Sequence, residues 1–210
     1  MHLAVRRGGA VGFAILEELL NRGANVEGAF QPDAHVDPCT LPETPLIEAL
    51  ARGEHAIAAL LLDRGANPDD TYGDGSAALV RLCGHYRYPS PEVARDLVAL
   101  LLNHGANVDG IPPDSEDHLP MEMPLPEAYH HDSTKIVELL VSRGASWCLN
   151  EEKDTALHVA TRDGKLRMAK IIFKKNKTHL YKKNKNGETP LGIALRRDDK
   201  KLLKIFSGEK

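Results

Sequence analysis

The sequence predicts an all-α fold in which short antiparallel helix pairs stack into a solenoid. Two observations predict it. A leucine-rich phrase that runs into a glycine occurs four times, at 18–28, 60–70, 100–110 and 138–148. A second phrase, built on Thr-Pro-Leu or a variant of it, recurs at intervals of 33, 46, 32 and 34 residues. Such self-similarity is the signature of a repeat array, whose units bury their apolar faces against neighbours. Hydrophobic residues make up 42% of the chain and aromatic residues 5%, so the core is expected to be aliphatic.

Each leucine-rich phrase predicts the end of a helix. Glycine takes the left-handed conformation that commonly closes a helix without steric cost. Asn176 is expected to replace glycine in a fifth unit, because it follows Leu157 by 19 residues, the distance from Leu46 to Gly65. The four glycines are Gly23, Gly65, Gly105 and Gly144.

The Thr-Pro-Leu phrases predict helix starts. The hydroxyl of Thr44 or Thr189 can accept a hydrogen bond from a free backbone N–H. The following proline lacks the N–H that the first turn would leave unpaired. In the variant at 155–158, Thr-Ala-Leu-His, His158 is expected to form structural hydrogen bonds.

This pattern resembles the ankyrin repeat, in which a hairpin is followed by Thr-Pro-Leu-His, two helices and Gly-Ala-Asp/Asn. Asp74-Gly75 and Asn186-Gly187 match the hairpin tips, and the family period is about 33 residues. The resemblance implies one array over 1–210, with protruding hairpin loops. Its expected units are an incomplete first repeat at 1–28, repeats at 44–66, 77–106, 123–145 and 155–176, and a C-terminal cap at 189–210.

The first and third repeats depart from the template. The opening HLAVRRGG aligns with the interior of a first helix, so the chain either starts inside a longer protein or begins with a degenerate cap. The first reading is favoured because a cap usually presents a polar face, and Leu3, Val5 and Phe13 are expected to lack a stacking neighbour. About three extra residues are expected between the helices of the first repeat, and 85–91 between those of the third. Long hairpins follow Gly23 and Gly105. Each insertion either contributes to binding or is tolerated drift.

Charge is divided unevenly along the chain. Residues 1–152 hold 10 Lys+Arg and 24 Asp+Glu, whereas 153–210 hold 17 and 6. The basic end is either a solvated cap or a docking patch for an acidic protein surface or an anionic membrane. Nucleic acid is disfavoured as a partner, because no recognition motif or interleaving of aromatic and basic residues accompanies the lysines.

The resemblance implies that first helices line a concave face and that hairpins project from it. Tyr86, Arg87 and Tyr88 extend the third repeat next to Tyr129 and His130 of the fourth. Tyrosine and arginine are favoured interface anchors, although these tyrosines can also be read as packing residues. The predicted partner-binding residues are Tyr72, Asp74, His85, Tyr86, Arg87, Tyr88, Tyr129, His130, His131, Arg162, Lys183 and Lys185.

Other classes of function find no support in the sequence. There is no phosphate loop, nucleophile elbow or zinc-protease motif, so no catalytic residue, cofactor or small-molecule substrate is expected. No metal site is expected either, since His85, His130 and His131 lack further ligands at suitable spacing. Cys39, Cys83 and Cys148 are read as free thiols of a reducing compartment, and no apolar run is long enough for a membrane span.

The sequence therefore predicts a non-enzymatic protein-interaction module, monomeric and located in the cytoplasm or in a host cytosol. The alternative is a substrate-recruiting ankyrin domain of a larger enzyme whose catalytic part lies upstream. That alternative rests on similarity in architecture to the ankyrin tails of bacterial effectors that act on host proteins such as caspases. The sequence upstream of Met1 would separate the two hypotheses.

Overall fold

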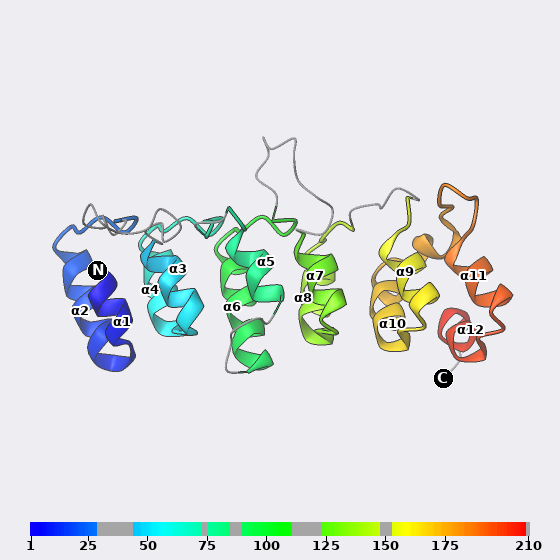
Figure 1. The fold of residues 1–210 in the computed structure, drawn as a ribbon, viewed down its shortest axis with the longest axis horizontal. Helices are drawn as coiled ribbons and strands as arrows, with labels where there is room; N and C mark the ends of the chain where they lie inside the picture. Colours follow the sequence, from blue (N-terminus) through cyan, green and yellow to red (C-terminus); the bar gives the residue numbers. More distant parts are fainter. Residues whose placement is uncertain (29–43, 73–74, 85–89, 111–122, 148–152, 209–210) are drawn as a thin grey trace. The chain divides into compact units, whose positions relative to one another are not determined.

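A computed structural model describes residues 1–28, 44–72, 75–84, 90–110, 123–147 and 153–208 (Figure 1). These residues form twelve α-helices in six consecutive pairs, one 3-10 helix and no strand, apart from an isolated bridge between Thr71 and Ala77. The all-α fold is therefore confirmed. The chain divides into two compact units, Met1–Asp117 and His118–Lys210.

The first unit contains three helix pairs with an aliphatic core. The pairs are α1 (His2–Arg7) with α2 (Gly9–Asn21), α3 (Pro45–Arg52) with α4 (His55–Asp63), and α5 (Ala78–Cys83) with α6 (Pro91–Asn103). Helix α4 packs between α2 and α6. The large side chains with almost no solvent exposure are Leu16, Leu46, Ile47, Leu50, Ile57, Leu61, Leu82, Leu97 and Leu101.

The second unit also contains three helix pairs. They are α7 (Pro124–His130) with α8 (Thr134–Ser142), α9 (Ala156–Asp163) with α10 (Leu166–Lys175), and α11 (Pro190–Arg196) with α12 (Lys200–Ser207). The 3-10 helix η2 (Lys177–Tyr181) lies between the last two pairs in sequence. Helix α10 packs against α8 and α12, and α9 packs against α11, so each pair stacks on the next.

The helix ends follow the predicted chemistry, with one exception. Gly23, Gly65, Gly105 and Gly144 have φ of 84°, 91°, 91° and 86°, as expected for left-handed closing residues. The hydroxyl of Thr44 accepts the N–H of Ile47 at 3.2 Å, and that of Thr189 accepts the N–H of Gly192 at 3.0 Å.

The expectation that Asn176 replaces a closing glycine is wrong. Its φ is −140° and its ψ is 91°, which is extended backbone. Its side-chain oxygen instead accepts the N–H of Thr178 at 3.2 Å and caps η2. An asparagine that can form a local hydrogen bond to the backbone competes with helix closure in this way.

The first repeat also differs from expectation. Only Gly8 separates α1 from α2, so its extra residues lengthen α2, which has 13 residues against 9 in α4. Leu3 is exposed, as expected of a side chain without a stacking neighbour, but Val5 is fully buried and Phe13 is partly buried. The other large hydrophobic side chains of this repeat that are exposed are Val11 and Ile15 on α2.

The third repeat shares this lengthening. Its second helix, α6, has 13 residues and begins at Pro91, one residue after the N-cap Ser90. The hydroxyl of Ser90 accepts the N–H of Val93 at 3.2 Å. Residues 85–89 lie outside the described part of the chain. Within the described ranges, no helix combines the length and apolar character required to cross a membrane.

Candidate functional site

Basic side chains and a buried acidic group meet at the ends of α9 and α11 in the second unit. Arg162 lies in the last turn of α9, and its Nη1 donates to Oδ2 of Asp154 at 2.7 Å. The side chain of Asp154 is fully buried, whereas that of Arg162 is 42% exposed. The hydrogen bond to Asp154 raises the pKa of Arg162, so the guanidinium remains charged.

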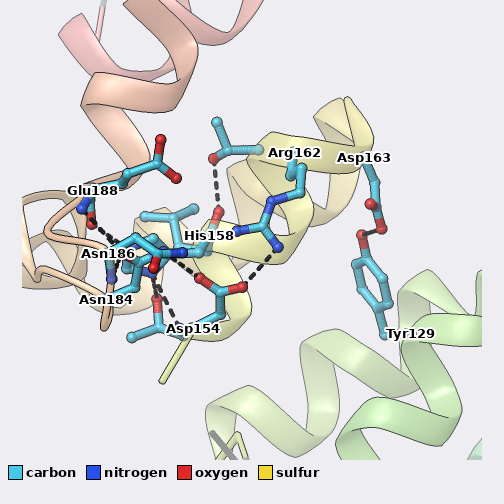
Figure 2. A network of polar contacts seen from close by, with 11 residues as sticks. Tyr129, Asp154, His158, Arg162, Asp163, Asn184, Asn186 and Glu188 are labelled. Carbon is cyan, nitrogen blue, oxygen red and sulfur yellow. Dashed lines mark hydrogen bonds and ion pairs between the residues drawn. The ribbon is translucent and has the colours of Figure 1, made fainter. Parts of the chain in front are cut away.

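The same carboxylate anchors the hairpin that precedes α11. Oδ1 of Asp154 accepts from Nδ2 of Asn184 at 2.8 Å (Figure 2). Oδ1 of Asn184 in turn accepts the backbone N–H groups of Asn186 at 3.0 Å and Glu188 at 2.9 Å. The buried side chain of Asn184 therefore holds the hairpin in place, whereas its sequence neighbours Lys183 and Lys185 remain exposed.

His158 ties α9 to this hairpin from within the core. Its Nδ1 accepts the N–H of Thr155 at 3.1 Å, which places the ring proton on Nε2. Nε2 then donates to the carbonyl oxygen of Glu188 at 3.0 Å. The prediction that His158 is a structural hydrogen-bonding residue is confirmed, since its ring is fully buried and both nitrogens are used.

Two further arginines continue the basic row onto α11. Nη1 of Arg197 donates to the carbonyl oxygen of Arg162, and Nη1 of Arg196 donates to the carboxylate of Glu188. Both arginines are exposed. The ends of α9 and α11 and the hairpin thus hold five cations on a common hydrogen-bonded frame. We call this set the basic rim: Arg162, Lys183, Lys185, Arg196 and Arg197.

Tyr129 lies in the fourth repeat and is a packing residue. It is 1% exposed, and its hydroxyl donates to Oδ2 of Asp163 at 2.6 Å (Figure 2). The Lys165 ammonium lies 4.3 Å from the ring centroid, and the Trp147 ring meets it edge-on at 5.4 Å. Burial and the hydrogen bond to Asp163 raise the pKa of Tyr129. The prediction that Tyr129 is a partner-facing anchor is wrong, because neighbouring side chains cover the ring.

Tyr72 in the first unit is also packed inward. It is 6% exposed, and the Arg81 guanidinium lies 4.3 Å from its ring centroid. Its N–H donates to the carbonyl oxygen of Ser76 at 2.9 Å across the hairpin. The packing interpretation therefore holds for Tyr72 and Tyr129, the two predicted partner-binding tyrosines that the structure describes. The predicted residues that lie outside the described part of the chain are Asp74, His85, Tyr86, Arg87 and Tyr88.

The two predicted histidines of the fourth repeat end α7. His130 is exposed, and Nε2 of His131 lies 3.2 Å from Oε1 of Glu127. Among the residues that the structure describes, no three His, Cys, Asp or Glu side chains cluster closely enough to hold a metal ion.

The comparisons with known proteins agree with this architecture. Residues 125–209 match the family model of ankyrin repeats in three copies, and residues 43–72 match the model of a single ankyrin repeat. Together the two matches cover more than half of the 210 residues. The chain belongs to the ankyrin-repeat family. Ankyrin repeats are in general non-catalytic modules of protein–protein interaction. No curated protein matches the chain.

Sequence reasoning missed the polar frame under the basic rim of this ankyrin-repeat protein. Asp154 directly precedes the Thr-Ala-Leu-His start, and Asn184 lies two residues before the Asn186-Gly187 tip. A signal for both was present, since asparagine and aspartate favour turns in which they bind nearby backbone groups. The hydrogen bond between Asp154 and Asn184 joins residues 30 positions apart in the sequence, so it becomes visible only in the folded structure.

Proposed function

We propose that this ankyrin-repeat protein binds an acidic segment of a protein partner through the basic rim of its second unit. The supporting observation is the arrangement of Arg162, Lys183 and Lys185 around the buried Asp154–Asn184 pair. Their backbones are held by hydrogen bonds before any partner arrives, which lowers the entropy that binding costs. His130 and His131 extend the proposed surface onto the fourth repeat.

The charge of the rim is only partly neutralised within the protein. Asp154 bonds Arg162, and Glu188 bonds Arg196. Lys183, Lys185 and Arg197 have no carboxylate partner among the described residues. Arginine offers bidentate geometry to a carboxylate, and lysine adds a mobile point charge. The rim is therefore suited to carboxylate-rich protein surfaces.

A photo-crosslinking amino acid placed at position 183 tests the proposal. In extracts of the source cells we expect it to capture a protein whose crosslinked peptide is acidic, identified by mass spectrometry. The same amino acid at Lys201, an exposed position on α12, is the matched control. Capture of one protein with equal yield from both positions would contradict the assignment.

With the partner in hand, Arg162→Gln should weaken binding by about tenfold or more, because it removes a charge held in a fixed position. Lys183→Glu with Lys185→Glu should mainly slow association at low salt and reduce the dependence of binding on salt. Calorimetry and surface plasmon resonance measure the two effects. Normal binding by both variants would place the site elsewhere on the chain.

A further inference from the structure

A second basic surface lies on helices that the proposed rim does not use. Helices α8 and α10, the second helices of the fourth and fifth pairs, enclose a groove of about 400 Å³. On α10, Lys170 and Lys174 line it one helical turn apart, and Ile171 forms part of its apolar wall together with Val141 of α8.

The charge of this α8/α10 groove is unbalanced. Lys170 and Lys174 are exposed, and among the described residues neither forms an ion pair. Nζ of Lys175 donates to the carbonyl oxygen of Ser142 at 3.1 Å, which links the two helices at one end of the groove. Glu138 is the one acidic side chain among the residues that line it. The groove thus offers two free ammonium groups beside an apolar surface.

The spacing of these groups defines the shape of a ligand. Residues four apart on a helix are separated by about 6 Å along its axis. Alternate side chains of an extended peptide on one face are about 6.6 Å apart. We propose that the α8/α10 groove binds an extended acidic segment of a protein, with acidic side chains at alternate positions on Lys170 and Lys174.

The described part of this surface fits a protein better than a membrane or a nucleic acid. The large exposed hydrophobic side chains are Leu3, Val11, Ile15, Tyr181 and Leu195, none of which lies on α8, α10 or α12. Insertion into a lipid surface relies on such side chains. Single-stranded nucleic acid is bound by stacking on exposed rings, but Phe173 of α10 and Phe206 of α12 are buried against each other.

The test uses the full chain and two fluorescein-labelled peptides of equal composition. In one peptide two glutamates stand at alternate positions among serines and valines, and in the other the same two glutamates are three residues apart, so that they lie on opposite faces of an extended chain. Fluorescence anisotropy at about 0.15 M ionic strength, where distant charges are screened, should show tighter binding of the alternating peptide. Lys170→Glu with Lys174→Glu should weaken that binding by about tenfold or more, since two attractions become repulsions. Glu138→Gln should strengthen it, because it removes the acidic group from the groove.

Lys200→Glu with Lys204→Glu is the matched control, with the same charge change one helical turn apart on α12, outside both the groove and the basic rim. It should leave binding of the alternating peptide within about twofold. Equal losses in the two double variants would show attraction to net charge and overturn the proposal. Equal binding of the two peptides would also overturn it, as would preferential binding of phosphatidylserine vesicles or single-stranded DNA that depends on Lys170 and Lys174. Lys170→Gln with Lys174→Gln repeats the measurement if the charge reversal impairs folding, monitored by circular dichroism. Because the proposed function depends on the rim, its failure would leave this result unchanged.

Discussion

At the scale of single residues, the ring of His158 stabilises two repeats at once. One nitrogen serves the N-terminus of α9 and the other serves the hairpin before α11. The ring of His158 is fully buried; its contact with Thr155 is buried and its contact with Glu188 is partly buried. A buried polar group that loses its hydrogen-bond partner costs about 1–3 kcal/mol of stability, so substitution of His158 is expected to destabilise the fold.

His158→Ala is therefore expected to lower the free energy of unfolding by about 2 kcal/mol or more, because it leaves the N–H of Thr155 and the carbonyl of Glu188 without their partner. Urea unfolding followed by circular dichroism measures the loss. His130→Ala is the matched control, since His130 is exposed on α7 and its loss should cost less than about 0.5 kcal/mol. Similar losses in both variants would refute the structural role of His158.

At the scale of helices and turns, the turns that follow the second helices of the first unit share one hydrogen-bonding arrangement. Oδ1 of Asn67 accepts the N–H of Asp69 at 3.1 Å, and a carboxylate oxygen of Asp69 accepts the N–H of Asn107 in the next repeat at 2.7 Å. Glu27 accepts the N–H of Asn67 at 2.7 Å in the same manner. Each turn is thus stabilised by a hydrogen bond within it and by a second hydrogen bond to the turn of the neighbouring repeat.

Asp69→Ala should destabilise the third repeat by about 1 kcal/mol, because an exposed charge-assisted hydrogen bond between repeats is lost. Hydrogen exchange of the Asn107 amide measures this locally and should become faster. Asp69→Asn keeps an acceptor oxygen and should retain most of the protection. Unchanged exchange in the alanine variant would show that the bond does not couple the repeats.

At the scale of the whole molecule, stability is expected to vary along the chain. Ile15 on α2 is 41% exposed, whereas Ile57 and Leu97, at the matching positions of α4 and α6, are almost completely buried. Leu3 on α1 is 83% exposed. A repeat gains stability from the neighbours on which it stacks. The first repeat therefore buries less of its apolar surface than the repeats that follow.

Hydrogen exchange of the intact chain should accordingly show lower protection in residues 1–23 than in α4 or α6, because local opening there exposes less additional apolar surface. Leu3→Glu should leave stability within about 0.5 kcal/mol, as expected for a surface position. Val5→Ala, at a fully buried position two residues away, should cost about 1–3 kcal/mol. Uniform protection from Leu3 onward would contradict this prediction.

The sequence by itself determined the repeat and its helix ends. The glycines that close helices, the Thr-Pro starts and the period of about 33 residues each rest on local chemistry, in which neighbouring residues decide the outcome. These features were predicted correctly, including the structural use of His158. The error at Asn176 is also local, because two turn conformations compete there and the sequence does not rank them.

Only the tertiary structure decided which polar and aromatic side chains face solvent. The bond from Tyr129 to Asp163 spans 34 residues, and the bond from Asn184 to Asp154 spans 30. Burial depends on such partners in the adjacent repeat, whose side chains approach only after stacking. A tyrosine at a helix end therefore reads as a surface anchor in the sequence, and the stacked neighbour makes it part of the core.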